Sequence, residues 1–149
     1  MSIPARFTFV TLGAGDVATL RGFYERLGWQ AANASVEGEV AFFWLNGLVL
    51  ALFDRASLYR EMHVEGDDAD PAPRARDVSI AINVETPEEV ATVLDEAKQA
   101  GGTILAPART MDWGGISGYF ADPEGHAWEV AYNPFMPLDA QGRLEPLEP

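Results

Sequence analysis

The sequence predicts an α+β fold in which a βαβββ module occurs twice along the chain. Apolar residues have helical spacing between Asp16 and Gly28 and again between Thr86 and Gly101, and each segment follows a strand-like run, RFTFVTL or DVSIAINV. Short apolar runs bounded by Gly, Pro or Asn come after each helix, as is typical of hairpin strands. Such an internal repeat indicates two modules that complete one another.

The first module covers about residues 6–54. Its first strand is expected at 6–12, and Asp16 is the expected N-cap of the following helix, which Gly28 ends. The apolar stripe of this helix consists of Val17, Leu20, Phe23, Tyr24 and Leu27. Three strands are then expected at 29–36, 39–45 and 48–54, the last two joined by the hairpin signal Asn46-Gly47.

The second module covers about residues 77–134, with its first strand at 77–84. Thr86-Pro87-Glu88-Glu89 predicts a helix start with a capping box, and the buried stripe is Val90, Val93, Leu94 and Ala97. Strands are expected at 103–106, 115–121 and 126–132. Residues 55–76 form a connector with a short helix near 57–63 and a solvated acidic piece, EGDDADPAPRAR, and residues 135–149 form a tail. We expect one domain over 1–149.

Composition excludes several classes of protein. The 149 residues are 48% apolar and contain no cysteine, so the chain is globular and has neither a disulfide nor a thiolate metal site. No signal peptide or membrane-length apolar run is present, which predicts a cytoplasmic protein without a membrane partner. The net charge of −13 argues against nucleic acid and favours a cationic ligand, although it also simply keeps a protein soluble. Nine Arg against one Lys suggest a bacterial source.

The segment SGYFADPEGHAWEVAYNP, residues 117–134, is expected to form a β-hairpin whose turn is Asp122-Pro123-Glu124-Gly125. Side chains of the return strand alternate between two faces. His126, Trp128, Val130 and Tyr132 share one face. The other face carries a carboxylate, Glu129, between Ala127 and Ala131, which leaves space above it for a metal, a ligand or water.

The two modules, together with FVTLGAGDVATLRGFYERLGW near the start and GYFADPEGHAWEVAYNP near the end, resemble the vicinal oxygen chelate superfamily. This superfamily includes glyoxalase I, bleomycin-resistance proteins and extradiol dioxygenases. The resemblance covers about residues 6–134. It implies that the strands curl into a concave half-barrel sheet around a central cavity, and that the modules pair within one chain or across a homodimer.

The resemblance also locates four positions at which metal-dependent members carry ligands. In this sequence they are Phe9, Ala51, Ser79 and Glu129. A catalytic divalent site needs about three His or carboxylate ligands. We therefore expect no metal and no other cofactor, which makes both glyoxalase I and dioxygenase chemistry doubtful.

Strand parity predicts which side chains face the cavity. The inward set is Phe7, Phe9, Thr11, Val49, Ala51, Phe53, Ser79, Ala81, Asn83, Ala127, Glu129 and Ala131, and the set under the helices is Val10, Leu12, Leu50, Leu52, Ile80, Ile82, Trp128 and Val130. Trp113-Gly114-Gly115 is either a lid or a tight turn with a packed indole. The candidate ligand-binding residues are Phe9, Thr11, Ala51, Phe53, Ser79, Asn83, Trp113, Tyr119 and Glu129.

Three function classes remain open. The first hypothesis is a metal-free protein that binds an organic ligand, cationic or aromatic, as the bleomycin-resistance branch does. The second is a metal-independent isomerase, epimerase or lyase in which Glu129 is the catalytic acid or base, with Tyr119, Ser79 or Asn83 as its partner. The third is a metal-dependent lyase or dioxygenase. We favour the first, and we expect a homodimer.

Overall fold

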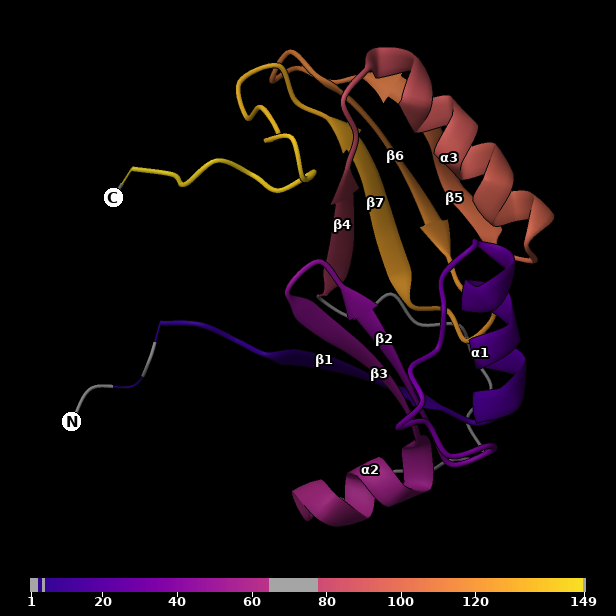
Figure 1. Cartoon of the computed structure of the whole chain (residues 1–149). Coiled ribbons are helices and arrows are strands. Elements are labelled where there is room, and N and C mark those ends of the chain that lie inside the picture. The colour runs from indigo at the N-terminus through magenta and orange to yellow at the C-terminus, as the bar shows by residue number, and fades with distance from the viewer. Residues whose placement is uncertain (1–2, 4, 65–77, 149) are drawn as a thin grey trace. The chain divides into compact units, whose positions relative to one another are not determined.

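The computed structural model describes residues 3, 5–64 and 78–148, and the chain divides into two compact units, residues 1–71 and 72–149. Each unit has its own open sheet, of three strands in the first and four in the second (Figure 1). The predicted α+β class is therefore confirmed. The acidic connector piece and Asp77 lie outside the described residues. Within the described part of the chain, no helix is long and apolar enough to cross a membrane.

The first unit contains a three-stranded sheet and two helices. The strands are β1 (Phe9–Ala14), β2 (Val40–Leu45) and β3 (Leu48–Asp54), in the order β1-β3-β2, with β1 parallel and β2 antiparallel to β3. The helices are α1 (Val17–Arg26) and α2 (Arg55–Met62). Asn46 and Gly47 have φ of 51° and 106°, so the β2–β3 connection has the two positive φ angles of a type I′ hairpin turn, as predicted.

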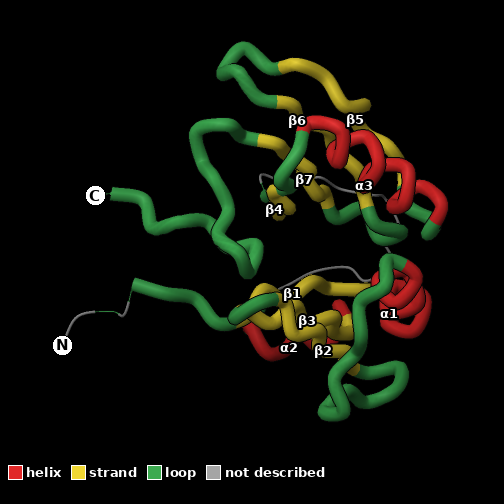
Figure 2. The backbone as a smooth tube through the Cα atoms, turned by 45° about the horizontal axis from the view of Figure 1, so that its top comes forward, coloured by secondary structure: helices red, strands yellow, loops and turns green. Residues whose placement is uncertain are grey.

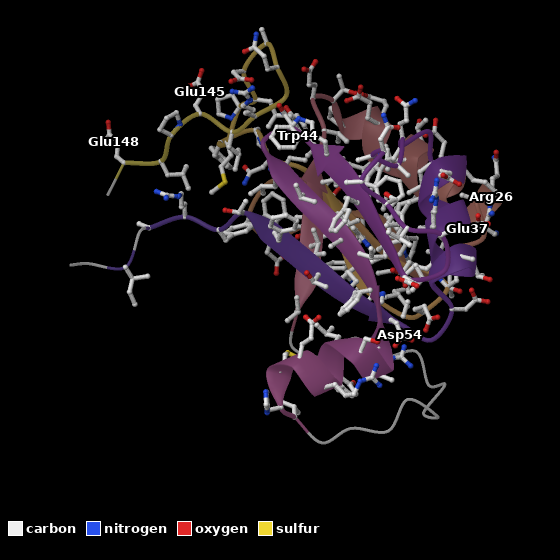
Figure 3. The ribbon with its side chains drawn as sticks, turned by 60° about the horizontal axis from the view of Figure 1, so that its bottom comes forward. Arg26, Glu37, Trp44, Asp54, Glu145 and Glu148 are labelled. Carbon is white, nitrogen blue, oxygen red and sulfur yellow. The ribbon has the colours of Figure 1, made fainter. Side chains whose placement is uncertain are left out.

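Helix α1 covers one face of this sheet because its apolar stripe needs burial. Asp16 caps it by accepting a hydrogen bond from the Thr19 amide at 3.0 Å, and Gly28 follows its end with φ of 91°. The buried core contains Leu12, Ala14, Val17, Leu20, Phe23, Tyr24, Ala41, Phe43, Leu50 and Leu52. Asp54, labelled in Figure 3, is the N-cap of helix α2. Its carboxylate accepts hydrogen bonds from the Ser57 amide and hydroxyl.

The strand predicted at 29–36 is wrong. Only two isolated bridges form there, Ala31 with Phe43 and Val36 with Val40. The segment turns back on itself, because the Ser35 amide donates to the Ala32 carbonyl at 3.0 Å. The Ser35 hydroxyl then takes the place of a backbone acceptor for the Phe42 amide, also at 3.0 Å. The first unit is thus βαββ with a bridged segment along β2.

The second unit is the complete βαβββ module that the sequence predicts. It consists of β4 (Ser79–Asn83), α3 (Pro87–Gln99), β5 (Thr103–Thr110), β6 (Ile116–Ala121) and β7 (Ala127–Tyr132). The sheet order is β4-β7-β6-β5, with β4 parallel to β7 and the other pairs antiparallel (Figure 2). Strand β5 extends well beyond the predicted 103–106. It passes through Pro107, which an edge strand tolerates.

Helix α3 packs on β5, β6 and β7 and covers one face of the second sheet (Figure 1). Phe120 and Trp128 stack beneath it with ring centroids 6.2 Å apart, and Val130 is fully buried, as parity predicts. Gly118 is required on this face, because a Cβ there would collide with the Leu94 side chain. Within residues 78–148, no helix of the second unit packs on the opposite face of the sheet. We call it the open face.

Candidate active or binding site on the second sheet

The open face is built from side chains that pair across neighbouring strands. Tyr119 of β6 lies opposite Glu129 of β7, and Ala81 of β4 lies opposite Glu129 on its other side. Because paired residues point to the same face, these three side chains form one row across the sheet. In the neighbouring row, Ser117 lies opposite Ala131. Glu129 is half-buried in the middle of this alanine-rich surface.

Ser117 holds the Glu129 carboxylate. Its hydroxyl donates to Glu129 Oε1 at 2.7 Å, and Ser117 itself is only 2% exposed. A short hydrogen bond from a buried hydroxyl fixes the rotamer of the carboxylate. The sequence reasoning did not select Ser117. Ser117 could have been found from its position: it lies two residues before Tyr119 in the same strand, and alternation puts both side chains on one face.

The Tyr119 hydroxyl belongs to the same cluster. Burial raises the pKa of Tyr119 above its ordinary value, and the negative charge of Glu129 and a hydrogen bond with Glu129 raise this pKa further. A hydrogen bond with Ser117 and the positive charge of Arg109 act on the pKa of Tyr119 in the opposite direction. Tyr119 is therefore a protonated donor beside a carboxylate at neutral pH.

The turn between β6 and β7 fixes the pairing register of these two strands and so positions the cluster. Asp122 is 3% exposed, and its Oδ1 accepts hydrogen bonds from the amides of Glu124 and His126 at 3.0 and 2.9 Å. Its Oδ2 lies 2.7 Å from Nδ1 of His126. Gly125 closes the turn with φ of 88°. The sequence identified this turn but not that Asp122 is buried and organises it.

The other candidates of the second unit lie on β4 and in the turn between β5 and β6. Ser79 and Asn83 of β4 pair with Ala127 and Ala131 and so share the face of Glu129. Trp113 is 42% exposed and packs against Gly115, because a Cβ on Gly115 would collide with its indole ring. The turn is closed by a hydrogen bond from the Met111 amide to the Gly115 carbonyl at 2.9 Å. The structure thus has the tight turn with a packed indole.

The candidates of the first unit share the sheet face opposite α1. Phe9 pairs with Val49 and Thr11 with Ala51, while Phe53 follows two residues later on the same face. Ala51 is buried, but Phe9 is 52% exposed and meets Phe42 edge-on with centroids 6.2 Å apart. This face is aromatic and the open face of the second unit is polar. A central cavity that combines the two stays a prediction.

The residues present do not fit a divalent metal centre. Of the four positions that the resemblance singles out, Phe9 and Ala51 have no donor atom, and Ser79 offers only a hydroxyl. The carboxylate of Glu129 is engaged by Ser117. Across residues 3, 5–64 and 78–148, no group of three His, Asp or Glu side chains could hold a metal ion. No step of the chemistry is therefore assigned to a metal here.

Comparison with known proteins agrees with this fold. The model of the Glyoxalase/Bleomycin resistance protein/Dioxygenase superfamily matches residues 6–130. The chain is 34% identical to a glyoxalase-related enzyme from Fulvimarina pelagi, with a TM-score of 0.84 over 97% of this chain and 100% of that one.

Two further solved structures are less similar. A glyoxalase/bleomycin resistance protein/dioxygenase from Nocardioides is 26% identical, with a TM-score of 0.67 over 89% of this chain and 85% of that one. A lactoylglutathione lyase from Agrobacterium tumefaciens is 22% identical, with a TM-score of 0.62 over 89% of this chain and 96% of that one, and supports the fold alone. No curated protein sequence matches significantly.

Proposed function

The chain belongs to the glyoxalase/bleomycin resistance protein/dioxygenase superfamily, and from this premise we propose that it binds a small organic ligand on the open face of the second sheet without a metal. Glu129 anchors a positively charged or hydrogen-bond-donating group of the ligand. Aromatic side chains such as Trp113 contact its apolar part. The observation that carries the proposal is the hydrogen bond from Ser117 to Glu129, because it holds a carboxylate ready on a surface of small side chains.

The physical argument rests on the surroundings of Glu129. Alanines lie on both sides of it along β7 and opposite it on β4, so on these two strands its neighbours are small. A half-buried carboxylate makes stronger charge-assisted hydrogen bonds than one in water. The net charge of −13 attracts a cationic ligand toward such a group.

A second candidate function is proton transfer at the same place. Tyr119, one of the three partners considered from the sequence, stands directly across from Glu129, which favours it as the second member of an acid–base pair. In this alternative the Glu129 carboxylate accepts a proton from the substrate, and the Tyr119 hydroxyl donates a hydrogen bond to the charge that develops. The description of the relative from Fulvimarina pelagi as a glyoxalase-related enzyme supports this candidate. The reaction would be an isomerisation, epimerisation or elimination.

We also propose that the protein acts as a homodimer in a bacterial cytoplasm. The homodimer is an expectation from the family, the bacterial source follows from the preference for Arg over Lys, and the cytoplasm is the expectation stated from the sequence. A native mass spectrum of freshly purified protein reports the number of chains, any co-purified ligand and any metal in one measurement. A monomer without ligand at micromolar concentration would contradict the homodimer.

The main test is a thermal-shift screen of cationic and aromatic compounds followed by calorimetry of the hits. Glu129→Gln should weaken binding by about 2 kcal/mol, because a charge-assisted contact becomes a neutral one while the volume is kept. Trp113→Ala should weaken binding of aromatic hits. Glu96→Gln is the matched control, since it makes the same change on the exposed surface of α3 and should leave affinity unchanged.

The outcomes separate the two candidates. Hits whose affinity depends on Glu129 and that are recovered unchanged support the binding protein. Turnover of a hit that disappears in both Glu129→Gln and Tyr119→Phe would replace it with the acid–base enzyme. Hits that bind wild type and Glu129→Gln equally well would remove Glu129 from the site altogether.

A further inference from the structure

The four strands of the second sheet contain just two charged side chains, Arg109 of β5 and Glu129 of β7. They have opposite signs. The other charged residues of the described part of the second unit lie in its helix, turns and tail. Charges are rare in sheet strands because half of each strand faces a core. The presence of one positive and one negative side chain in this sheet therefore needs an explanation.

Arg109 lies on the open face because it pairs with Ser117. The β5–β6 pairing has two register shifts, one between Ile104 and Ala106 and one between Ala106 and Arg109. Each shift adds one residue to β5, so Arg109 faces the same side of the sheet as Thr103, which pairs with Ala121. Such bulges are common at sheet edges and next to functional sites.

Arg109 and Glu129 then lie on the same face with the Ser117–Tyr119 strand between them. Two inter-strand steps place their backbones roughly 10 Å apart across the sheet, and Arg109 is one row further along. Arg109 is exposed, and among the described residues it pairs with no carboxylate. Its positive charge still acts on the Tyr119 hydroxyl. The guanidinium is thus close to the cluster but available to an additional anion.

We infer that the ligand of the open face carries both a negative and a positive or donor group, with Arg109 binding the anion and Glu129 binding the donor. This inference rests on the proposed function and adds the ligand class to it: an amphoteric molecule such as an amino acid or peptide derivative. The guanidinium presents paired donors that match a carboxylate or phosphate. Ala106, beside Tyr119, and Ala131, beside Ser117, are small side chains that leave room for the apolar part of the ligand next to the two charges.

Electrostatics supports an occupant with both charges. A purely anionic ligand would meet the carboxylate of Glu129 and the overall charge of −13, while a purely cationic one would be repelled by Arg109. An amphoteric ligand pairs with both side chains at once. The second contact is then intramolecular, so it adds to affinity even though the Arg109 side chain is exposed.

The test uses three probes of matched length, hexylamine, hexanoate and 6-aminohexanoate, titrated into ¹⁵N-labelled full-length protein and followed by amide chemical shifts. The wild type should bind 6-aminohexanoate about fivefold more tightly than hexylamine and should bind hexanoate most weakly. Arg109→Gln should abolish the advantage of 6-aminohexanoate and leave hexylamine binding intact. Arg21→Gln makes the same charge change on α1 and should alter nothing.

Each failure has its own pattern. Equal binding of hexylamine and 6-aminohexanoate by the wild type would overturn the inference of an amphoteric ligand, and so would an advantage of 6-aminohexanoate that survives in Arg109→Gln. In both cases, hexylamine binding that depends on Glu129 would still support the proposed function. Hexylamine binding that persists in Glu129→Gln, or no shift with any probe, overturns the proposed function and the inference with it. The amide spectra also show directly that each variant is folded.

Discussion

The Tyr119 hydroxyl and the Glu129 carboxylate face one another across the β6–β7 pair, and each alters the chemistry of the other. Ionising Tyr119 would place a phenolate beside a carboxylate on a partly desolvated surface, which is unfavourable. Glu129 in turn gains a fixed rotamer from the Ser117 hydroxyl. Ser117, Tyr119 and Glu129, from two strands, therefore form one hydrogen-bonded cluster.

Glu129→Gln should lower the pKa of Tyr119 toward its ordinary value. The substitution removes the negative charge that opposes ionisation, although burial continues to raise the pKa. The measurement is a pH titration of the tyrosine ring ¹³Cζ resonances, with Tyr119→Phe to assign the signal among the four tyrosines. An unchanged pKa of Tyr119 would mean that the two side chains are not in contact in solution.

The same pKa shift has a consequence for stability at high pH. Because the pKa of Tyr119 is higher in the folded than in the unfolded chain, the stabilisation from this group is complete below about pH 10 and is lost as pH rises through the folded value. Glu129→Gln should reduce that alkaline loss. Urea unfolding at neutral pH and above pH 10, in both variants, measures the difference.

Sequence parity placed Glu129, Ser79 and Asn83 on one face, since alternation is a local property of a strand. It could not identify Ser117 as the residue that holds Glu129, because that contact depends on the pairing register of β6 with β7. Arg109 was missed because the strand predicted at 103–106 ended before it, whereas β5 continues to Thr110.

The elements with a local signal were the ones that could be predicted. Asp16, Asn46-Gly47 and the Thr86–Glu89 start all act within a few residues of themselves, so their effects can be read without the tertiary structure. The strand predicted at 29–36 failed because its apolar residues are interrupted by a turn that uses the Ser35 hydroxyl. Strand β5 was predicted too short because a proline such as Pro107 indicates the end of a strand, unless the strand is known to lie at the edge of its sheet.

Thr86→Ala should destabilise the second unit by about 1 kcal/mol. The capping box joins Thr86 and Glu89, and the Glu89 carboxylate accepts hydrogen bonds from the amides of Thr86 and Glu85 at 2.8 and 2.9 Å. Alanine removes the hydroxyl that completes the box. Urea unfolding measures the loss, and ligand affinity should stay the same because Thr86 lies at a helix start.

Thr92→Ala is the control for this change. Thr92 is exposed in the middle of α3, and its hydroxyl donates only to the Glu88 carbonyl of the preceding turn, at 3.3 Å. Its replacement should change the free energy of unfolding by less than about 0.5 kcal/mol. Equal effects of the two substitutions, or a loss of ligand affinity in Thr86→Ala with an unchanged melting temperature, would show that the capping box has a different role.

At the scale of the whole molecule, the chain distributes its chemistry unequally between its two units. The first presents aromatic side chains on the sheet face opposite α1, such as Phe9 and Trp44, which are 52% and 69% exposed. The second presents charged and hydroxyl groups. The repeat could be predicted from the sequence because each unit buries one helix-covered face by the same pattern. The division of apolar and polar groups between the other faces could not, since it depends on individual side chains.

The purified protein should bind no stoichiometric divalent metal. Metal-dependent members of the family are expected to draw ligands from both modules, but here the first contributes Phe9 and Ala51, which cannot coordinate a cation. The second contributes the Glu129 carboxylate and the Ser79 hydroxyl, and a single carboxylate with one hydroxyl is too weak a donor set for a catalytic centre.

Elemental analysis after dialysis against Zn²⁺, Mn²⁺ or Ni²⁺ and removal of free ions measures the metal content. Glu129→Ala should match the wild type, since the strongest donor of the set holds no ion. About one ion per chain in the wild type, lost in Glu129→Ala, would contradict the metal-free proposal and restore a metal-dependent reaction.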